Sequence, residues 1–370
     1  VDGEGAPFVS IGMDCVNMTM DTPVEGREFL FPNLLLAQHG FINYYKDIIK
    51  RRYPGVTWME QCKVAQYRRL HDWGFNTIAN WSDERFSYMP KMAFTVNAEL
   101  GRSWKRWQEF PDVYSEEFQK SVRDEAQKKC KKYANESLLL GYFIGNEEHW
   151  ADRDFIHLIL TDEKPSATKA KIQSYLKEHG DTPESHDALV EMLARQYFSV
   201  ISDAIHEADP HHLMLGIRWA GHAPDAVLRA NDVFDVFSIN IYRFEPDAEQ
   251  LSHIFELTHK PILIGEFHFG APERGMAPSL VAVRDQQQRG VAYRYFVEHS
   301  LALPMVVGTH YFQYLDEPVT GRFDGENYNC GFVSVTDQPY EALFSASHAT
   351  ADVAIAVHAG KLPPFDTKAS

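Results

Sequence analysis

The sequence predicts an α/β fold of the (β/α)8, or TIM, barrel type, and three observations carry that prediction. Apolar runs typical of buried strands alternate with helical segments along the 370 residues, which indicates a parallel sheet. Eight such runs occur, which favours a closed barrel over an open sheet. No glycine-rich dinucleotide fingerprint follows any strand, which also argues against an open, doubly wound sheet. We therefore expect one domain over residues 1–370.

The strand runs are apolar and end where polar residues begin, and the helices between them repeat apolar residues at three- and four-residue steps. The capping pattern Thr57-x-x-Glu60 predicts a helix to about residue 73, and Ser115 opens another. Three insertions are expected near 14–55, 152–184 and 313–329. The predicted strands are 8–13, 75–79, 91–94, 138–147, 213–218, 233–240, 261–266 and 305–311, and later helices are 184–208, 280–300 and 341–358.

Composition excludes several classes of function. The formal net charge of −16 disfavours binding to nucleic acid or to anionic membranes. The four cysteines are scattered without zinc-site spacing, and no run of 18 apolar residues predicts a membrane span. The chain begins at Val1 rather than at methionine, so we expect that a signal peptide or an upstream domain was removed and that the protein is secreted or periplasmic.

Two glutamates end strand runs and are the strongest candidates for chemistry. Glu147 ends the run 138–147, and Glu266 ends the run 261–266. The carboxyl ends of barrel strands surround one mouth, where active sites of this fold are found. Two carboxylates at one mouth are the groups that cleave a glycosidic bond. The sequence therefore predicts a retaining glycoside hydrolase with Glu147 as acid/base and Glu266 as nucleophile.

Neighbouring polar residues support this assignment. Asn146 is placed to hold the sugar hydroxyl next to the reacting carbon, and the Asn-Glu order favours Glu147 over Glu148, because alternate side chains of an extended segment face opposite sides. Tyr242 follows the sixth strand, and its hydroxyl is expected to donate to Glu266 and so stabilise and orient that carboxylate. A single glutamate at a strand end is more often a salt-bridge partner, so the assignment depends on both acids together.

Longer motifs resemble glycoside hydrolase family 50, the β-agarases, within the clan of retaining glycosidases on (β/α)8 barrels. The resemblance implies an exo-acting enzyme that releases neoagarobiose from agar-type polysaccharide, with Glu147 as acid/base and Glu266 as nucleophile. We expect no cofactor and no catalytic metal, since the seventeen histidines lack metal-site spacing, and a structural Ca²⁺ stays open. Gly145 stands where the family pattern has Asp, and His310-Tyr311-Phe312 replaces a Trp. The segments that carry the resemblance are PFVSIG (7–12), LGIR (215–218), GEFHFGA (265–271), FQY (312–314) and PVTGRFDGENYN (318–329).

Further residues at strand ends or on the long eighth loop are expected to contact substrate. Other interpretations stay open: Trp81 could belong to the core, Arg218 to an ion pair with a catalytic carboxylate, and the acidic loop residues to the solvated surface. The expected substrate contacts, beside Asn146 and Tyr242, are Asn80, Trp81, Arg218, Asn240, His268, Gln313, Asp324 and Glu326.

Two other functions compete with the agarase prediction. A β-galactosidase-like enzyme, or a hydrolase of carrageenan or porphyran, would use the same two carboxylates, and a sulfate pocket of Arg or Lys would favour it. A barrel that binds carbohydrate without cleaving it is the alternative from another class, and the presence of both carboxylates argues against it. The sequence leaves the oligomeric state open.

Overall fold

The computed structural model describes residues 3–31, 40–87, 89, 92–101, 109–150, 154–221 and 223–370. The chain forms two compact units. Unit 1 comprises Val1–Phe94, Tyr242–Pro246 and Gly265–Ser370, and unit 2 comprises Thr95–Ile241 and Asp247–Ile264. The single domain expected from the sequence stays a prediction.

Unit 1 contains a sheet built around the first and last strands of the chain. Strand β1 pairs in parallel with β11 on one side, Ser10 opposite Gly308, and with β4 on the other, Gly12 opposite Thr77. The order in this unit is β10–β11–β1–β4–β5. The strands are β1 (Ser10–Met13), β4 (Thr77–Ile78), β5 (Ala93–Asn97), β10 (Ile262–Glu266) and β11 (Val306–Tyr311), of which β5 and β10 have residues in both units.

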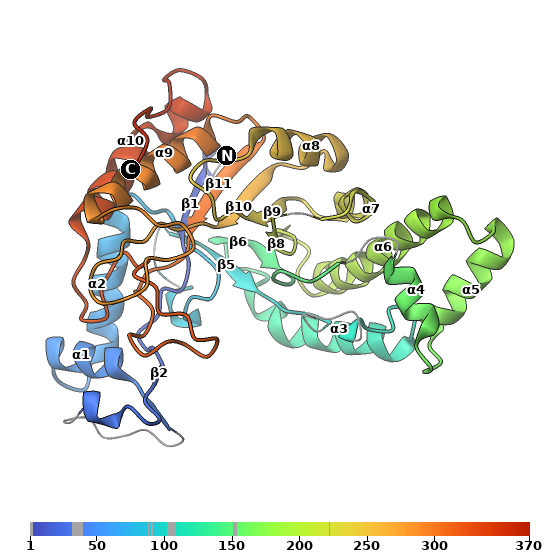
Figure 1. The fold of residues 1–370 in the computed structure, drawn as a ribbon, viewed down its shortest axis with the longest axis horizontal. Coiled ribbons are helices and arrows are strands. Elements are labelled where there is room, and N and C mark those ends of the chain that lie inside the picture. Colours follow the sequence, from blue (N-terminus) through green and yellow to red (C-terminus); the bar gives the residue numbers. More distant parts are fainter. Residues whose placement is uncertain are drawn as a thin grey trace. The chain divides into compact units, whose positions relative to one another are not determined.

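Helices and the antiparallel pair of strands β2 and β3 complete unit 1. Helices α9 and α10 lie side by side in Figure 1. Phe267, directly after β10, stacks on Phe296 of α9 and lies edge-to-face with Tyr311 of β11. The elements are β2 (Thr22–Pro23), η1 (Glu28–Leu30), β3 (Phe41–Ile42), α1 (Tyr44–Arg52), α2 (Trp58–Asp72), η3 (Glu84–Phe86), α9 (Gln286–Leu301) and α10 (Glu341–His358).

Unit 2 holds the remaining strands around a core of Phe143, Leu215, Val236 and Leu263. Helix α3 packs along α6, and Ser115 caps α3 as predicted, because its Oγ accepts a hydrogen bond from the Phe118 amide at 3.1 Å. The elements are α3 (Glu116–Lys129), η5 (Lys131–Tyr133), β6 (Leu139–Phe143), α4 (Asp154–Thr161), α5 (Ala167–His179), α6 (Pro183–Ala208), β7 (Leu213–Met214), β8 (Trp219–Ala220), α7 (Asp225–Arg229), η6 (Ala230–Val233), β9 (Phe237–Asn240) and α8 (Ala248–Thr258).

The hydrogen-bonding order of the strands is that of a (β/α)8 fold. In unit 2 the order is β5–β6–β7 and β8–β9–β10. The predicted fifth strand, 213–218, is observed only as the short β7, and β8 follows after a break in which Arg218 has a left-handed φ of 54°. If β7 and β8 are counted as one strand, the sheet has eight strands. Their hydrogen-bonding order is then cyclic, β1–β4–β5–β6–β7/β8–β9–β10–β11 and back to β1. The predicted α/β class with eight strands is confirmed.

Several predicted boundaries were wrong, each for a local reason. Strand β6 ends at Phe143 rather than Glu147, and Glu147 cannot belong to it because its φ of 56° is not that of extended chain. Helix α9 begins at Gln286 rather than near 280, because residues 281 and 283 hydrogen-bond to Gly270 and Asp285 caps the helix. Thr57 precedes α2 without the predicted capping bond.

Parts of some predicted segments lie outside the described residues. Lys91, the first residue of the predicted third strand, is one of them, and the structure begins β5 at Ala93. The insertions near 14–55 and 152–184 also include undescribed residues, at 32–39 and 152–153. The described part of the second insertion is helical, in α4 and α5.

Two findings bear on expectations from composition. All four cysteines are free thiols, and Cys62, Cys130 and Cys330 are buried. Within the residues that the structure describes, no helix combines the length and the apolar character that a membrane crossing needs.

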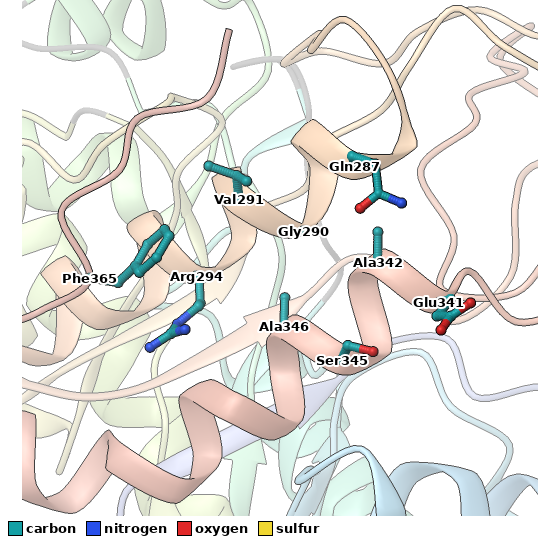
Figure 2. A pocket seen from close by; sticks show the side chains of 9 residues that line it. All are labelled: Gln287, Gly290, Val291, Arg294, Glu341, Ala342, Ser345, Ala346 and Phe365. Atoms are coloured by element: carbon teal, nitrogen blue, oxygen red, sulfur yellow. The ribbon is translucent and has the colours of Figure 1, made fainter.

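The contact between α9 and α10 depends on a residue without a side chain. A Cβ on Gly290 would lie 2.3 Å from the carbonyl oxygen of Ala342 and 3.4 Å from Cβ of Ala346. Figure 2 shows these residues of the two helices facing one another, beside a cavity of about 310 Å³. The glycine therefore sets how closely the helices approach.

We expect Gly290→Ala to lower the free energy of unfolding by about 1–3 kcal/mol, even though alanine favours helix, because the backbone contact must open. Chemical denaturation of the variant measures this. Gln287→Ala, on the exposed surface of the same helix, is the control and should change little. A Gly290→Ala protein as stable as the wild type would contradict the packing argument.

Candidate active site

Glu266 is held by two hydrogen-bond donors from different parts of unit 1. It is the last residue of β10 and is 6% exposed. The Tyr242 hydroxyl donates to Oε2 at 2.6 Å, and the Trp81 indole Nε1 donates to Oε1 at 3.3 Å. Both carboxylate oxygens therefore have a partner, and the side chain has a defined orientation.

The two donors are positioned by backbone outside the strands. Trp81 follows β4 with a left-handed φ of 62°, which turns its indole towards Glu266. Tyr242 comes two residues after β9. The hydrogen bond from Tyr242 was predicted, whereas sequence reasoning considered Trp81 only as a sugar contact or a core residue and missed its bond to the carboxylate.

His268 supports Tyr242 from the side and is neutral. Its ring lies edge-to-face on the Tyr242 ring, with 4.6 Å between centroids. Nδ1 lies 3.0 Å from the Phe312 carbonyl oxygen and therefore donates, while Nε2 accepts from the Leu280 amide at 3.2 Å. Burial lowers the pKa of His268 to about 3. Both ring nitrogens are occupied by backbone groups, so the geometry favours a positioning role over the predicted contact with substrate.

The low pKa of His268 predicts a loss of stability in acid. The ordinary pKa of histidine is 6.5, so in the unfolded chain this side chain binds a proton as the pH falls below 6.5. In the folded protein it remains neutral until about pH 3. The free energy of unfolding should therefore fall by about 2–3 kcal/mol between neutral pH and pH ~4.5 from this group. Urea titrations across that range measure it. His268→Gln should flatten the dependence, whereas His348→Gln, at an exposed histidine, should not. An unchanged slope in His268→Gln would contradict the assignment.

Glu147, in unit 2, lies in a left-handed turn after β6. Its amide donates to the Arg218 carbonyl oxygen at 3.2 Å, and Asn240, the last residue of β9, donates from Nδ2 to its Oε1 at 2.9 Å. The residue is partly exposed. Sequence reasoning placed Asn240 among the substrate contacts, and the structure shows that it holds the glutamate.

A buried arginine orients the neighbouring asparagine. Arg218 is 0% exposed, its guanidinium stacks on the Phe143 ring at 4.9 Å, and its Nε donates to Oδ1 of Asn146 at 2.9 Å. The Arg218 amide also donates to Ser238 Oγ at 2.8 Å, a contact that sequence reasoning missed. Because Arg218 is buried, the geometry argues for a positioning role rather than the predicted contact with sugar.

The structure separates the two adjacent glutamates. Glu148 is 5% exposed and folds back on the chain, so that a Cβ on Gly145 would lie 1.7 Å from its Oε1. Gly145 therefore makes room for the Glu148 carboxylate, which explains why a glycine occupies this position. Of the two carboxylates, Glu147 is the more accessible, in agreement with the preference from the Asn-Glu order.

Comparisons with known proteins agree with the motifs. β-Agarase B of Vibrio sp. (strain JT0107) is 31% identical over 361 residues, which cover 82% of this chain and 38% of that protein. β-Agarase A of the same strain is 31% identical over 370 residues, covering 82% and 36%. The crystal structure of an agarase, AgWH50C, matches with a TM-score of 0.86 at 27% identity, covering 97% of this chain and 62% of that one. The chain resembles glycoside hydrolase family 50.

The sequence similarity to the agarases covers only part of those proteins. The chain spans 38% and 36% of the length of the two relatives. No family model matches the sequence. The structural match nevertheless covers nearly the whole chain and supports the α/β fold class.

Two further residues predicted to contact substrate differ in their hydrogen bonding, namely Asn80 and Gln313. Asn80 follows β4 and is 1% exposed, and among the described residues its carboxamide oxygen and nitrogen have no hydrogen-bond partner. Buried polar atoms are nearly always paired, so this amide suits a water or a sugar hydroxyl. Gln313 is partly buried, and its carbonyl oxygen accepts from the Phe332 amide at 3.3 Å.

The two acidic residues predicted on the eighth loop are paired with an arginine that sequence reasoning missed. Arg322 contacts Asp324 at 2.9 Å and also Glu326, and its third partner, the buried Glu317, is 3.4 Å away. Burial raises the pKa of Glu317 to about 7. The alternation Arg-x-Asp-x-Glu over 322–326 was the signal in the sequence for this cluster.

Other places in the structure are poorer candidates for this chemistry. The cavity in Figure 2 has a single carboxylate, Glu341, on its lining, and its Arg294 is paired with Glu298 at 2.7 Å. No group of three or more metal-binding side chains occurs among the residues described. The two hydrogen-bonded glutamates are therefore the strongest candidates for catalysis.

Proposed function

We propose that the protein is a retaining glycoside hydrolase that cleaves a β-linked galactan, as a β-agarase. The observation that carries the proposal is the pair of donors, Tyr242 and Trp81, on the two carboxylate oxygens of Glu266. A carboxylate held in this way at a strand end suits a nucleophile. The similarity to proteins named β-agarase supports the substrate.

The reaction follows from two carboxylates in complementary roles. An oxygen of Glu266 attacks the anomeric carbon as the bond to the leaving oxygen breaks, and Glu147 gives that oxygen its proton. Glu147 then takes a proton from water, the water oxygen attacks the same carbon, and Glu266 leaves. The bond from Asn240 orients Glu147 for both steps. Retaining glycosidases in general use two carboxyl groups about 5–5.5 Å apart.

Finer parts of the proposal come from the resemblance to family 50. They are exo action and release of neoagarobiose. A secreted or periplasmic location and one catalytic domain over residues 1–370 are further parts of the proposal. A β-galactosidase-like enzyme or a hydrolase of carrageenan or porphyran is the second candidate, since it would use the same acids.

The test is product analysis on agarose, porphyran, the carrageenans and an aryl β-galactoside, with proton NMR following the anomeric configuration of the first product. A single disaccharide from agarose, released first as the β anomer, is the expected result. First release of the α anomer would contradict the retaining mechanism. Cleavage restricted to a sulfated galactan would replace the substrate, and binding of agarose without any cleavage would favour a non-catalytic barrel.

A further inference from the structure

Phe323 exposes an aromatic ring almost completely to solvent. It is 91% exposed on the loop that follows β11. A large apolar side chain at such exposure contributes little burial free energy to the fold, and single exposed residues also occur without function. The residues around Phe323 therefore have to show whether its exposed ring could bind a ligand.

The loop around Phe323 is held by its own hydrogen bonds. The Arg322 amide donates to the Glu326 carbonyl oxygen at 2.8 Å, and the Gly325 amide donates to the Arg322 carbonyl oxygen at 2.9 Å. The Arg322 guanidinium lies 5.6 Å from the Phe323 ring centre and pairs with Asp324 and Glu326. The ring is thus presented on a tight turn rather than on a loose tail.

The same loop reaches the surroundings of Glu266. The Arg322 guanidinium lies 5.6 Å from the Phe312 ring centre, and the Phe312 carbonyl oxygen accepts from His268. Tyr328, at the other end of the turn, places its ring 6.0 Å from that of His268. His268 in turn packs on Tyr242, so unbroken contacts within unit 1 connect Phe323 to the proposed nucleophile.

The chemistry around the ring fits an uncharged sugar. The apolar C–H face of a pyranose packs on an aromatic face, and carboxylates accept hydrogen bonds from its hydroxyls. Asp324 and Glu326 keep 33% and 30% of their side chains exposed beside the ring. The Arg322 guanidinium is shared among three carboxylates, so its charge is already balanced and it is poorly suited to binding a sulfate ester.

We propose that Phe323, with Asp324 and Glu326, forms a distal subsite that binds a neutral pyranose unit of the galactan chain. This inference rests on the proposed function and deepens it, because it names unsulfated galactan as the substrate class. It also predicts that the subsite contributes only when the substrate is long enough to reach the loop.

The test measures kcat/KM of wild type, Phe323→Ala and Phe323→Trp on agaro-oligosaccharides of increasing length. Loss of the ring should lower kcat/KM on the long substrates by about tenfold, mainly through KM, and leave the shortest substrate unchanged. Phe323→Trp should keep the wild-type profile. Phe255→Ala, which removes a partly exposed ring from α8, is the matched control and should change nothing.

Two results would overturn the subsite: equal values for Phe323→Ala and wild type at every length, or an equal loss on short and long substrates. A second readout is independent of cleavage, namely retardation of Glu266→Gln during electrophoresis in gels containing agarose or carrageenan. Phe323→Ala in that background should weaken retardation by agarose, and unchanged retardation would count against the subsite. A wild type that cleaves no galactan would refute the proposed function, while the gel comparison would still decide the role of Phe323.

Discussion

Replacing Glu266 with alanine is expected to lower kcat on agarose by about 10⁴-fold or more, because the variant cannot form the covalent intermediate. The fold should tolerate the change, since the hydrogen-bond donors Tyr242 and Trp81 can both turn to water. Initial rates on agarose, with the melting temperature measured alongside, test this prediction.

Azide gives this experiment a positive readout. In Glu266→Ala the small anion can attack the anomeric carbon in place of the missing carboxylate, and a β-linked substrate should then give an α-glycosyl azide. Glu273→Ala, at an exposed glutamate of the same unit, is the control and should retain full activity. A Glu266→Ala enzyme with more than about one-tenth of wild-type kcat would rule out the nucleophile role.

Replacing Glu147 with glutamine is expected to cost about 10²- to 10⁴-fold in kcat/KM on agarose, since the leaving oxygen loses its proton donor. Substrates whose leaving group needs no protonation should lose less in the first step. Rates on agarose and on an aryl galactoside with an activated leaving group test both points.

Glu148→Gln is the matched control for Glu147→Gln. Glu148 is buried against Gly145, so its replacement should alter stability more than the response to the leaving group. With azide, Glu147→Gln should yield a β-glycosyl azide by attack on the glycosyl-enzyme. If Glu148→Gln showed these signatures and Glu147→Gln did not, the acid/base would have to be reassigned.

Local sequence signals determined much of the fold. Helix α10 spans Glu341–His358 as predicted, and α3 begins after Ser115, because helical periodicity and capping are set by residues close in the chain. Glu266 was placed at the end of β10, since a buried apolar strand must stop where a charged side chain needs partners. Alternation of these elements along the chain was sufficient for the (β/α)8 class.

The sequence alone could not determine what surrounds the two glutamates, because those contacts join residues far apart in the chain. The donors to Glu266 come from Trp81 and Tyr242, and the donor to Glu147 comes from Asn240. Left-handed backbone at Glu147 and Trp81 turns their side chains in directions that strand alternation does not predict. The sequence thus predicts which polar residues lie near the strand ends, whereas the direction and partners of each side chain depend on tertiary packing.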